Sequence, residues 1–588
     1  MKFLDKTSIE NLKKIFKIIK IYKKACILSA VLFFLVASLK LPMPLLTGYL
    51  IDNVILRKKI ALLNSICGLL ILLTIIYLLL NYLKDKMTFI IQTQIMIRLR
   101  VKLLSHVQQL KIKDISAMET GYLLARIMDD PYYLSGLLFQ SLFNFAQSII
   151  TLLIGIIVIF TINWRLSLVT LIILPFFVKS NSLFIDKIKY WTNRIKEQKA
   201  IITKELSGSL RAIKITKLFL LYGEEKLKFF KNLRKEFEYS MKQFNYDYLI
   251  LITSGFFAAL GPLVVVWFGG FEIINNRMTI GQLVAFSSLL GFLFNPAKTM
   301  LNIHIDFQKS LVSLNRIYEI LMMPIEETYG GSINKYRSPR NFDIEFKNIS
   351  SSYNGLDKVL EDINLKITEN ETIALVGPIG SGKSTLIHLL IRLYDPIEGA
   401  IFIGGVNIKD IPLKKLRDSI GVVSQKDFLF STSIYDNIRL GNLKAGHEDI
   451  IQATHMANAY DFIKALPNGF DTAVGEGGEF LSGGQLQLIS LARVLLKKPP
   501  ILILDEPTSA VDSNTEKLIQ EALKQFARGR LTIIISHRLS TIVNADRVVI
   551  MENGRIMDIG SHTELLMKNI FYTKIYNEQI DSFIKKIP

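Results

Sequence analysis

The chain has 588 residues, more than one hydrophobic core usually supports, so we expect at least two domains. Hydrophobic residues make up 50% and charged residues only 21%, which excludes a disordered, collagen-like or coiled-coil protein and is too apolar for an ordinary soluble enzyme. The 2 cysteines exclude a disulfide scaffold and a cysteine-rich metal site. The net charge of +20 would permit nucleic-acid binding. Where the basic residues lie along the chain determines whether they indicate such a partner.

The beginning of the chain, residues 1–24, is rich in lysine and runs directly into an apolar stretch. Basic residues beside a hydrophobic span are typical of the cytoplasmic side of a membrane protein. A signal peptide fits less well, because the apolar stretch is too long and no small-residue cleavage site follows it. We therefore assign the basic excess mainly to membrane topology and expect no nucleic-acid partner.

Six apolar stretches are long enough to cross a lipid bilayer as helices, which takes about 20 residues each. They cover residues 26–50, 62–83, 141–162, 166–185, 249–271 and 280–300. The links after the first, third and fifth spans are short, whereas those after the second and fourth are long, charged and helical in periodicity. With a cytoplasmic N-terminus, the long basic links also fall on the cytoplasmic side. We expect an all-α six-helix transmembrane domain with long cytoplasmic helical extensions.

One charge lies well inside the first span, because Lys40 precedes Pro42 and Pro44 near its middle. An ionisable residue within a membrane span is a functional hypothesis by default. Lys40 could line a polar translocation cavity or meet an anionic substrate. It could equally snorkel or pair with a neighbouring helix, and the sequence leaves both interpretations open.

The composition changes after the membrane spans. Residues 322–341 contain the proline, glycine and serine of a linker, and beyond them short apolar runs alternate with amphipathic stretches, as in a mixed α/β domain. We therefore predict a transmembrane domain over residues 1–321, a linker over 322–341 and an α/β domain over 342–588.

The α/β domain carries a P-loop between an apolar strand and a helical run. Its residues are Gly377, Pro378, Ile379, Gly380, Ser381, Gly382, Lys383 and Ser384, followed by Thr385. The glycines let backbone N–H groups face phosphates, and the helix N-terminus adds its dipole. In such a loop Lys383 reaches the β- and γ-phosphates and the Ser384 hydroxyl coordinates Mg²⁺.

Paired carboxylates follow a second apolar strand, at Asp505 and Glu506. A buried strand that ends at Asp505 would place its carboxylate beside the Mg²⁺ water shell, and Glu506 could polarise the attacking water. A solvated acidic turn would give the same pattern, so this motif is strong only together with the P-loop.

A third motif precedes the helix that leads to the Asp505 strand. It consists of Leu481, Ser482, Gly483, Gly484 and Gln485. Alone it could be a serine N-cap with a flexible turn, or a second anion-binding helix N-terminus. The order of P-loop, Leu-Ser-Gly-Gly-Gln and Asp-Glu strand resembles the ATP-binding cassette (ABC) ATPases. Six spans followed by one such domain resemble an exporter-type half-transporter, the group of bacterial multidrug, lipid and peptide exporters, over essentially the whole chain.

The resemblance implies roles for individual residues, including ATP binding at the P-loop through Thr385 and at Ser482 to Gln485. Glu506, His537 and Gln425 would be catalytic, with His537 at the γ-phosphate. Mg²⁺ would be held by Ser384, Gln425 and Asp505, partly through water. Tyr353 would stack on adenine, and Asp512 would lie in the loop that contacts the opposite subunit. Residues 121–130 and 208–215 resemble the two coupling helices that rest on the nucleotide domains, although solvated helical extensions would look the same.

Each ATP in this family lies between the P-loop of one subunit and the signature motif of another. The resemblance therefore implies a homodimer, or a heterodimer with a related half-transporter. It implies an ATP hydrolase that moves a hydrophobic or amphipathic substrate (drug, lipid or peptide) across or out of the bacterial inner membrane by alternating access. The N-terminus and the nucleotide-binding domain would be cytoplasmic. A lipid flippase and a leader-independent peptide exporter are alternatives within this class. An ATP-gated channel or receptor is the alternative from another class, whereas a soluble cassette ATPase does not account for the six spans.

Overall fold

The computed structural model describes residues 22–136, 141–326, 339–353, 355, 357–424, 427–506, 513–536, 538, 542–574 and 576–577. The chain divides into two compact units. The first, here the membrane unit, comprises Met1–Gln108 and Met118–Met323. The second, here the nucleotide unit, comprises Gln109–Ala117 and Pro324–Pro588.

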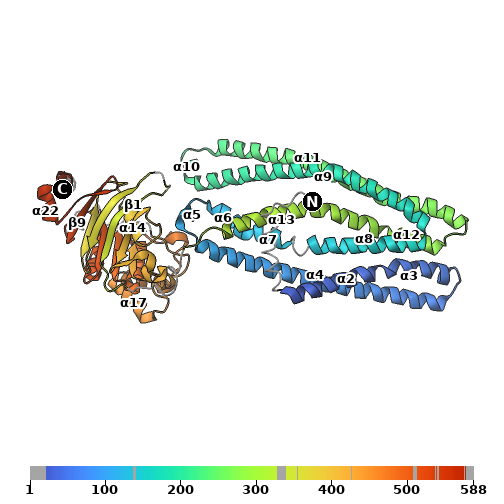
Figure 1. Ribbon diagram of the computed structural model, residues 1–588, viewed down its shortest axis with the longest axis horizontal. Helices are drawn as coiled ribbons and strands as arrows, with labels where there is room; N and C mark the ends of the chain where they lie inside the picture. The colour runs from blue at the N-terminus through green and yellow to red at the C-terminus, as the bar shows by residue number, and fades with distance from the viewer. Residues whose placement is uncertain are drawn as a thin grey trace. The chain divides into compact units, whose positions relative to one another are not determined.

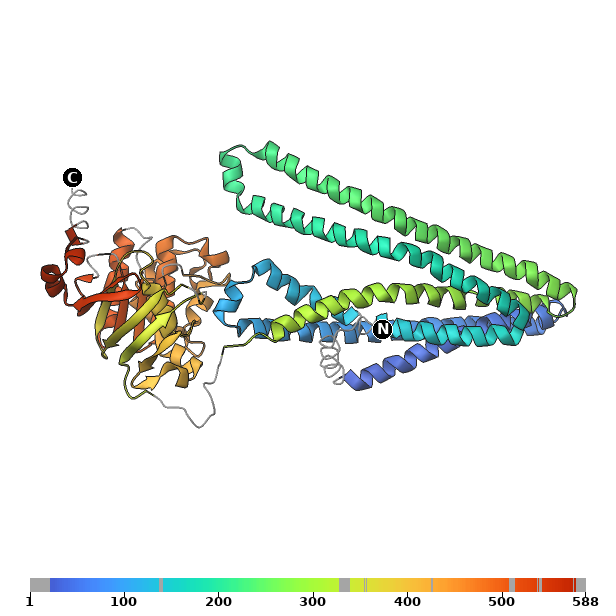
Figure 2. The same cartoon turned by 45° about the horizontal axis from the view of Figure 1, so that its top comes forward.

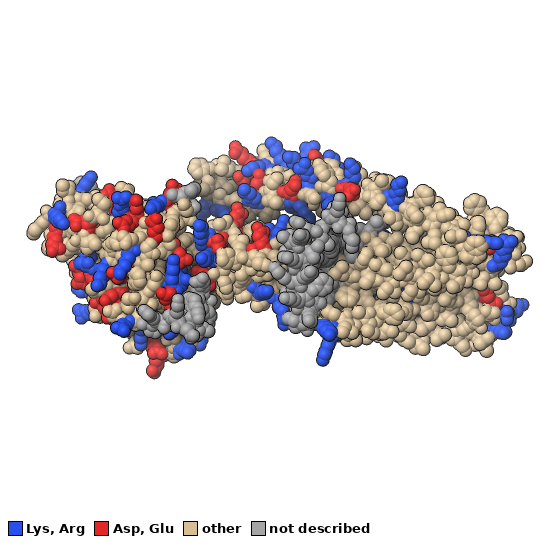
Figure 3. All heavy atoms as spheres, viewed as in Figure 1, with Lys and Arg blue, Asp and Glu red and all other residues tan. Residues whose placement is uncertain are grey.

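The membrane unit is helical throughout its described residues. Its elements are α2 (Lys23–Lys40), α3 (Pro42–Leu50), the π-helical segment η2 (Ile51–Ile55), α4 (Ile60–Gln108), α6 (Thr120–Met128), α7 (Asp130–Gly136), α8 (Leu142–Ile162), α9 (Trp164–Arg211), α10 (Ile213–Leu218), α11 (Tyr222–Ile274), α12 (Ile280–Leu289) and α13 (Gly291–Leu321). In the described part of the chain, 6 stretches are long and apolar enough to cross a membrane, which confirms the predicted spans. Figure 3 shows a broad uncharged surface over these stretches, with basic and acidic side chains toward its ends.

Three of the spans continue far beyond a bilayer. The helices α4, α9 and α11 have 49, 48 and 53 residues, so each is roughly 70–80 Å long at 1.5 Å per residue. That is more than twice the roughly 30 Å of hydrocarbon that a span must cross. Figures 1 and 2 show α9 and α11 side by side, with α10 at their shared end. The predicted helical extensions are therefore confirmed.

Polar side chains hold the short turns at the ends of the spans that are remote from the long helical extensions. Asn163 begins α9 by accepting a hydrogen bond from the Leu166 N–H at 3.0 Å. Asp52 in η2 accepts from the N–H of Gly281 at 2.8 Å, at the start of α12. A Cβ on Gly48 would lie 2.6 Å from the Gly281 carbonyl oxygen, so these glycines allow α3 and α12 to pack closely.

The nucleotide unit contains two sheets, which confirms the predicted α/β domain. An antiparallel sheet has the order β2-β1-β4-β5, with β1 (Ile344–Ser351), β2 (Leu360–Ile367), β4 (Glu398–Ile403) and β5 (Val406–Asn407). A second sheet has the order β10-β9-β3-β8-β7-β6, with β3 (Thr372–Val376), β6 (Ile420–Val423), β7 (Ile501–Asp505), β8 (Leu531–Ile535), β9 (Arg547–Glu552) and β10 (Arg555–Gly560). Its strands run parallel except β10, which pairs antiparallel with β9.

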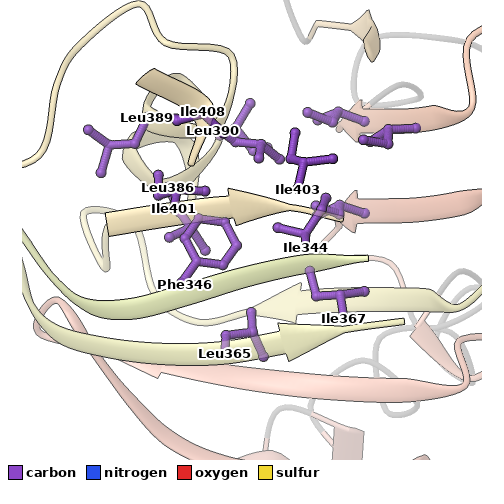
Figure 4. Packing of buried hydrophobic residues seen from close by; sticks show 14 of the residues in the cluster. Ile344, Phe346, Leu365, Ile367, Leu386, Leu389, Leu390, Ile401, Ile403 and Ile408 are labelled. Atoms are coloured by element: carbon purple, nitrogen blue, oxygen red, sulfur yellow. The ribbon is translucent and has the colours of Figure 1, made fainter. Parts of the chain in front are cut away.

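The nucleotide unit also contains helical segments. They are α5 (Ile112–Ser116), α14 (Lys383–Leu390), η5 (Ile408–Asp410), α15 (Leu413–Asp418), α16 (Ile434–Arg439), α17 (His447–Met456), α18 (Tyr460–Ala465), η6 (Gly469–Asp471), η7 (Glu476–Gly478), α19 (Gly483–Lys497), α20 (Ser513–Ala527) and α22 (His562–Lys568). Figure 4 shows the packing that fixes α14: its Leu386, Leu389 and Leu390 lie in one buried cluster with Phe346 and Ile401 of the antiparallel sheet. Because α14 is held by this core, the loop that precedes it is held as well.

A short stretch of the first long link, residues 109–117, packs with the nucleotide unit of the same chain. Leu110 forms a β-bridge with Ile325, and the Lys111 ammonium lies 3.7 Å from the Asp395 carboxylate. Residues 121–130 belong instead to the membrane unit. The predicted contact of residues 121–130 with a nucleotide domain, which the resemblance assigns for one of the two segments to the opposite subunit, stays a prediction. The second predicted coupling segment, 208–215, covers the end of α9 and the start of α10 and stays a prediction.

Candidate nucleotide site

The P-loop joins β3 to α14 and has the backbone that its glycines permit. Gly380 and Gly382 have φ angles of +83° and +97°, in the left-handed region that favours glycine. A Cβ on Gly377 would lie 2.0 Å from the carbonyl oxygen of Met551, so no larger residue fits there without movement. The curled backbone at the N-terminus of α14 is the arrangement that binds phosphate through N–H groups.

Lys383 is buried at the centre of this loop. Its ammonium donates to the carbonyl oxygens of Gly377 at 2.8 Å and Pro378 at 2.9 Å, and to the Ser381 hydroxyl at 3.2 Å. Burial lowers the pKa of Lys383, and the carboxylates of Glu506 and Asp505 act in the opposite direction. The loop, the lysine and the acidic pair therefore belong to one site.

Asp505 reaches this site because of the sheet order. It ends β7, which pairs with β8, and β8 pairs with β3, so the carboxyl ends of these parallel strands share one edge. Burial raises the pKa of Asp505, and Glu506 raises it further, whereas His388 and Lys383 lower it. Burial and the charge of Glu506 thus disfavour the charged form of Asp505, and nearby cations favour it.

The turn after β7 gives Glu506 a backbone conformation that differs from that of the strand. Glu506 has a φ of +48°, which is uncommon for a non-glycine residue and frequent at functional sites. Its N–H donates to the carbonyl oxygen of Ile535 in β8 at 2.9 Å, which holds the turn. Two adjacent carboxylates can therefore serve different partners.

His388 is a site residue that the sequence prediction missed. The Tyr353 hydroxyl lies 3.0 Å from the Thr385 hydroxyl and 3.4 Å from His388 Nδ1. The Tyr353 ring packs edge-on against Tyr394, with 4.9 Å between ring centroids, and is 39% exposed. Burial lowers the pKa of His388, opposed by the charge of Asp505. The available signal was its position on the P-loop helix, one turn beyond Ser384.

The Leu-Ser-Gly-Gly-Gln motif begins α19 with a reciprocal cap. The Ser482 hydroxyl accepts from the Gln485 N–H at 3.3 Å, and the Gln485 side chain accepts from the Ser482 N–H at 2.9 Å. Ser482 and Gly483 are exposed, whereas Gly484 is buried. The structural interpretation of this motif as a serine cap is therefore correct, and it leaves the exposed helix N-terminus available for an anion.

The structure does not bring this motif to the P-loop of the same chain. The helix α19 packs against β6 at one edge of the sheet, whereas the P-loop follows β3. Two strands, β8 and β7, separate β3 from β6, which places the two strands about 14 Å apart. Gln425, Asp512 and His537 lie outside the described residues.

The oxygen donors fit a nucleotide-bound Mg²⁺ better than an all-protein metal site. Among the described residues no group of three or more His, Cys, Asp or Glu side chains could hold a metal ion. The site offers instead the exposed Ser384 hydroxyl and one carboxylate, Asp505. Mg²⁺ is usually bound by one or two carboxylates together with substrate phosphates, and this donor set matches that preference.

Comparisons with known proteins cover both units. Residues 26–297 match the family model described as "ABC transporter transmembrane region", and residues 360–509 match the model described as "ABC transporter". The chain is 32% identical to "Putative multidrug export ATP-binding/permease protein YgaD" of Bacillus subtilis (strain 168) over 97% of this chain and 99% of that protein. It is 33% identical to a similarly named protein, SAV1866, of Staphylococcus aureus (strain Mu50 / ATCC 700699), over 97% and 100%.

A solved structure shares the fold over nearly the whole length. It is described as "Structure of a bacterial Atm1-family ABC exporter with ATP bound" and has a TM-score of 0.83 with 25% identity. The alignment covers 95% of this chain and 99% of that chain. One chain thus combines a membrane unit and a nucleotide unit of the kinds that the sequence predicted.

Proposed function

The chain belongs to the family of ABC transporters, and on that premise we propose that it works as a homodimer in the bacterial inner membrane. It is a multi-pass membrane protein that binds ATP and an ATP-driven exporter whose hydrolysis of ATP is coupled to transport. The proposal adds the subunit arrangement, the roles of the site residues, the orientation with a cytoplasmic N-terminus, and a hydrophobic or amphipathic cargo moved by alternating access.

One observation supports the proposed dimer. The two phosphate-binding helix N-termini of one nucleotide unit, those of α14 and α19, do not share a site. The P-loop follows β3 and Ser482 begins the helix at β6, with two strands between these positions. A bound triphosphate at Lys383 therefore needs the exposed Ser482 and Gly483 of a second copy to be enclosed. A related half-transporter could supply them, but the P-loop, the signature and Glu506 are all present here, which favours two identical chains.

Each site residue then has a chemical task. The P-loop N–H groups and Lys383 bind the β- and γ-phosphates, and Tyr353 meets the adenine. Ser384, Asp505 and Gln425 would hold Mg²⁺, which neutralises phosphate charge when it is bound. Glu506 orients and polarises the attacking water, and His537 contacts the γ-phosphate. Asp512 contributes to the contact between subunits.

ATP couples to the membrane spans because it binds the closed pair of nucleotide units better than the open pair. Closure turns the cargo cavity outward, and loss of the γ-phosphate contacts lets the pair reopen. We assign this work to a transmembrane domain over residues 1–321 and a nucleotide-binding domain over 342–588, joined by a linker over 322–341. A lipid flippase and a leader-independent peptide exporter use the same cycle.

A subunit-mixing experiment tests the composite site. Lys383→Ala breaks the P-loop and Ser482→Arg breaks the signature, so each variant alone should be inactive. Mixed dimers of the two contain one site with both defects and one intact site, and we expect ATPase activity to return. The matched control mixes wild type with the double variant, whose mixed dimers have one defect in each site and should add no activity. If ATPase activity does not return in the first mixture, the result would show that a site forms within one chain.

Vesicle transport separates a pump from an ATP-gated channel. Inside-out vesicles that contain the wild-type protein should accumulate a fluorescent amphiphile against its gradient only when ATP is present. A channel would instead only dissipate a gradient that is already established. Accumulation that equals that of Glu506→Gln vesicles would contradict export.

A further inference from the structure

The membrane spans carry ionisable side chains of one sign only. Across residues 26–50, 62–83, 141–162, 166–185, 249–271 and 280–300, the ionisable acidic and basic side chains are those of Lys40, Lys179 and Lys298. No aspartate or glutamate occurs in these ranges. A charge in the hydrocarbon layer costs free energy and normally faces a partner, a water-filled cavity or a ligand.

The span that contains Lys298 turns its polar side chains outward. Among residues 287–299, the exposed ones are Ser288, Asn295 and Lys298, and all three are polar. The buried ones on the same stretch include Leu289 and Phe292, so its apolar face is inside the unit. This is also the least apolar and most buried of the six spans.

A lipid-facing span of the same unit shows the opposite arrangement. In α8 the exposed residues include Leu153, Ile157 and Phe160, whereas the small residues Ser148 and Gly155 are buried. Figure 3 shows a broad surface of uncharged side chains on one side of the membrane unit, as lipid contact requires. The exposed face of the Lys298 span is therefore suited to an aqueous cavity and not to lipid.

Lys40 lies beside this span. It is the last residue of α2, one helical residue before α3 begins at Pro42. Its ammonium lies 6.0 Å from the ring centroid of Tyr77 in α4 and 5.8 Å from that of Phe292 in α13. The charge is thus placed against two aromatic rings on different helices.

The three span lysines form no ion pair within the part of the chain that the structure describes. Lys84, which directly follows the apolar stretch 62–83 within α4, provides the contrast. It is buried, lies 3.3 Å from the Asp85 carboxylate and donates to the Asn81 side chain at 2.9 Å. A buried structural lysine in this unit is therefore compensated by a carboxylate and an amide, whereas the span lysines have no carboxylate partner among the described residues.

The three lysines all lie well away from the short turns along their helices. Along their helices, Lys298 is about 27 Å from Ile280, and Lys179 is about 22 Å from Trp164, at 1.5 Å per residue. Lys40 is about 22 Å from Ile55 by the same measure. Lys40 is thus near the middle of its span, whereas Lys179 and Lys298 are nearer the ends that are remote from the short turns, which are the cytoplasmic ends in the proposed orientation.

We propose that the cargo is an amphiphile with an acidic head group, such as a phosphate, sulfate or carboxylate on an apolar chain. Lys40 and Lys298 bind the head group, Lys179 adds positive charge, and the ring of Tyr77 beside Lys40 contacts the apolar chain. Charge complementarity favours this occupant over a cationic drug, which the three lysines would repel. The inference rests on the proposed export of an amphipathic cargo, and it further specifies that the head group of the cargo is negatively charged.

The test uses the full chain in phosphatidylcholine nanodiscs, with three probes that share a twelve-carbon tail. Dodecyl phosphate is acidic, dodecyl maltoside is neutral and dodecyltrimethylammonium is cationic. We expect dodecyl phosphate to stimulate ATP hydrolysis at the lowest concentration. Inorganic phosphate should not stimulate, which separates an amphiphile from a free anion, and added phosphatidylglycerol tests a bilayer lipid as the source of the head group.

Lys298 variants test whether Lys298 itself recognises the charge of the head group. Lys298→Gln should raise the half-saturating concentration of dodecyl phosphate about tenfold, because a charged hydrogen bond is lost. Lys298→Glu should reverse the preference toward dodecyltrimethylammonium, a gain that misfolding cannot mimic. Lys59→Gln, which removes an exposed lysine from a short turn, is the matched control and should behave as wild type.

The outcomes separate this inference from the function on which it rests. Stimulation and vesicle accumulation with no charge preference, or a Lys298→Glu preference equal to that of wild type, would overturn the acidic cargo and leave export intact. A wild-type protein that neither responds to nor accumulates any of the three amphiphiles would overturn both proposals.

Discussion

The side-chain amide of Asn163 donates a hydrogen bond to Glu272 Oε2 at 3.0 Å, across 109 residues of sequence. Asn163 lies in the turn between α8 and α9, and Glu272 lies in the last turn of α11. The Glu272 side chain is 7% exposed and also lies 3.6 Å from Arg165 and 3.8 Å from Arg277. One buried carboxylate therefore ties together the short turns at this end of the spans.

Removing that carboxylate should destabilise the membrane unit. Glu272→Ala leaves the amide of Asn163 and two guanidinium groups without their acceptor, which should cost about 1–3 kcal/mol. We expect a lower midpoint of thermal unfolding, measured by size exclusion in detergent. Glu238→Ala is the control, because Glu238 is exposed in its pair with Arg234 and such pairs contribute about 0–1 kcal/mol. Equal midpoints for the two variants would contradict a structural role for Glu272.

Glu506→Gln should separate nucleotide binding from turnover. The amide keeps the shape of the side chain but does not polarise the attacking water as a carboxylate does, so turnover should fall at least a hundredfold, on the order expected for a lost general base. ATP binding should persist, and closed dimers should accumulate on native gels. Glu521→Gln, an exposed acid on α20, is the control and should keep wild-type activity. Unchanged ATPase in Glu506→Gln would remove this residue from its assigned role.

Lys383→Ala should instead impair binding itself. The variant removes the buried ammonium that the loop carbonyl oxygens hold at 2.8 and 2.9 Å, and with it the charge for the phosphates. The dissociation constant for ATP should rise at least about tenfold in titration calorimetry. Lys409→Ala changes an exposed lysine of η5 and serves as the control. Wild-type affinity in Lys383→Ala would argue against the phosphate cradle.

The Glu371–Arg547 pair predicts a pH dependence of stability in the nucleotide unit. Burial raises the pKa of Glu371, but the hydrogen bonds from Arg547 and Thr368 outweigh it, so the pKa lies below its ordinary value of 4.5. The folded state therefore gains stability above about pH 4.5, and this gain is lost as the pH falls through the lowered folded pKa.

Glu371→Gln tests the sign of this effect. The variant should melt at a lower temperature than wild type at pH 7, and the two melting temperatures should converge below about pH 4.5. Glu369→Gln, two residues earlier and exposed, is the control and should show no such convergence. A difference that is constant with pH would contradict the assigned pair.

Local patterns in the sequence were sufficient for the spans and for most of the nucleotide site. Twenty apolar residues have few conformations in lipid other than a helix, and the glycines of a P-loop are required by the left-handed backbone at Gly380 and Gly382. Gln425, Asp512 and His537 remain predictions, as do the domain boundaries. His388 was not predicted, because a histidine on an amphipathic helix has no spacing that marks it.

Tertiary structure alone decided which distant segments meet. The stretch from Gln109 to Ala117 packs with the nucleotide unit through Ile325, and Asn163 meets Glu272, although neither pairing leaves a local pattern. The composition of a span likewise fixes that it lies in the membrane but not which side it turns inward. Whether Lys298 faces lipid, protein or a cavity depends on the helices packed around it, since burial is a property of neighbours and not of the residue itself.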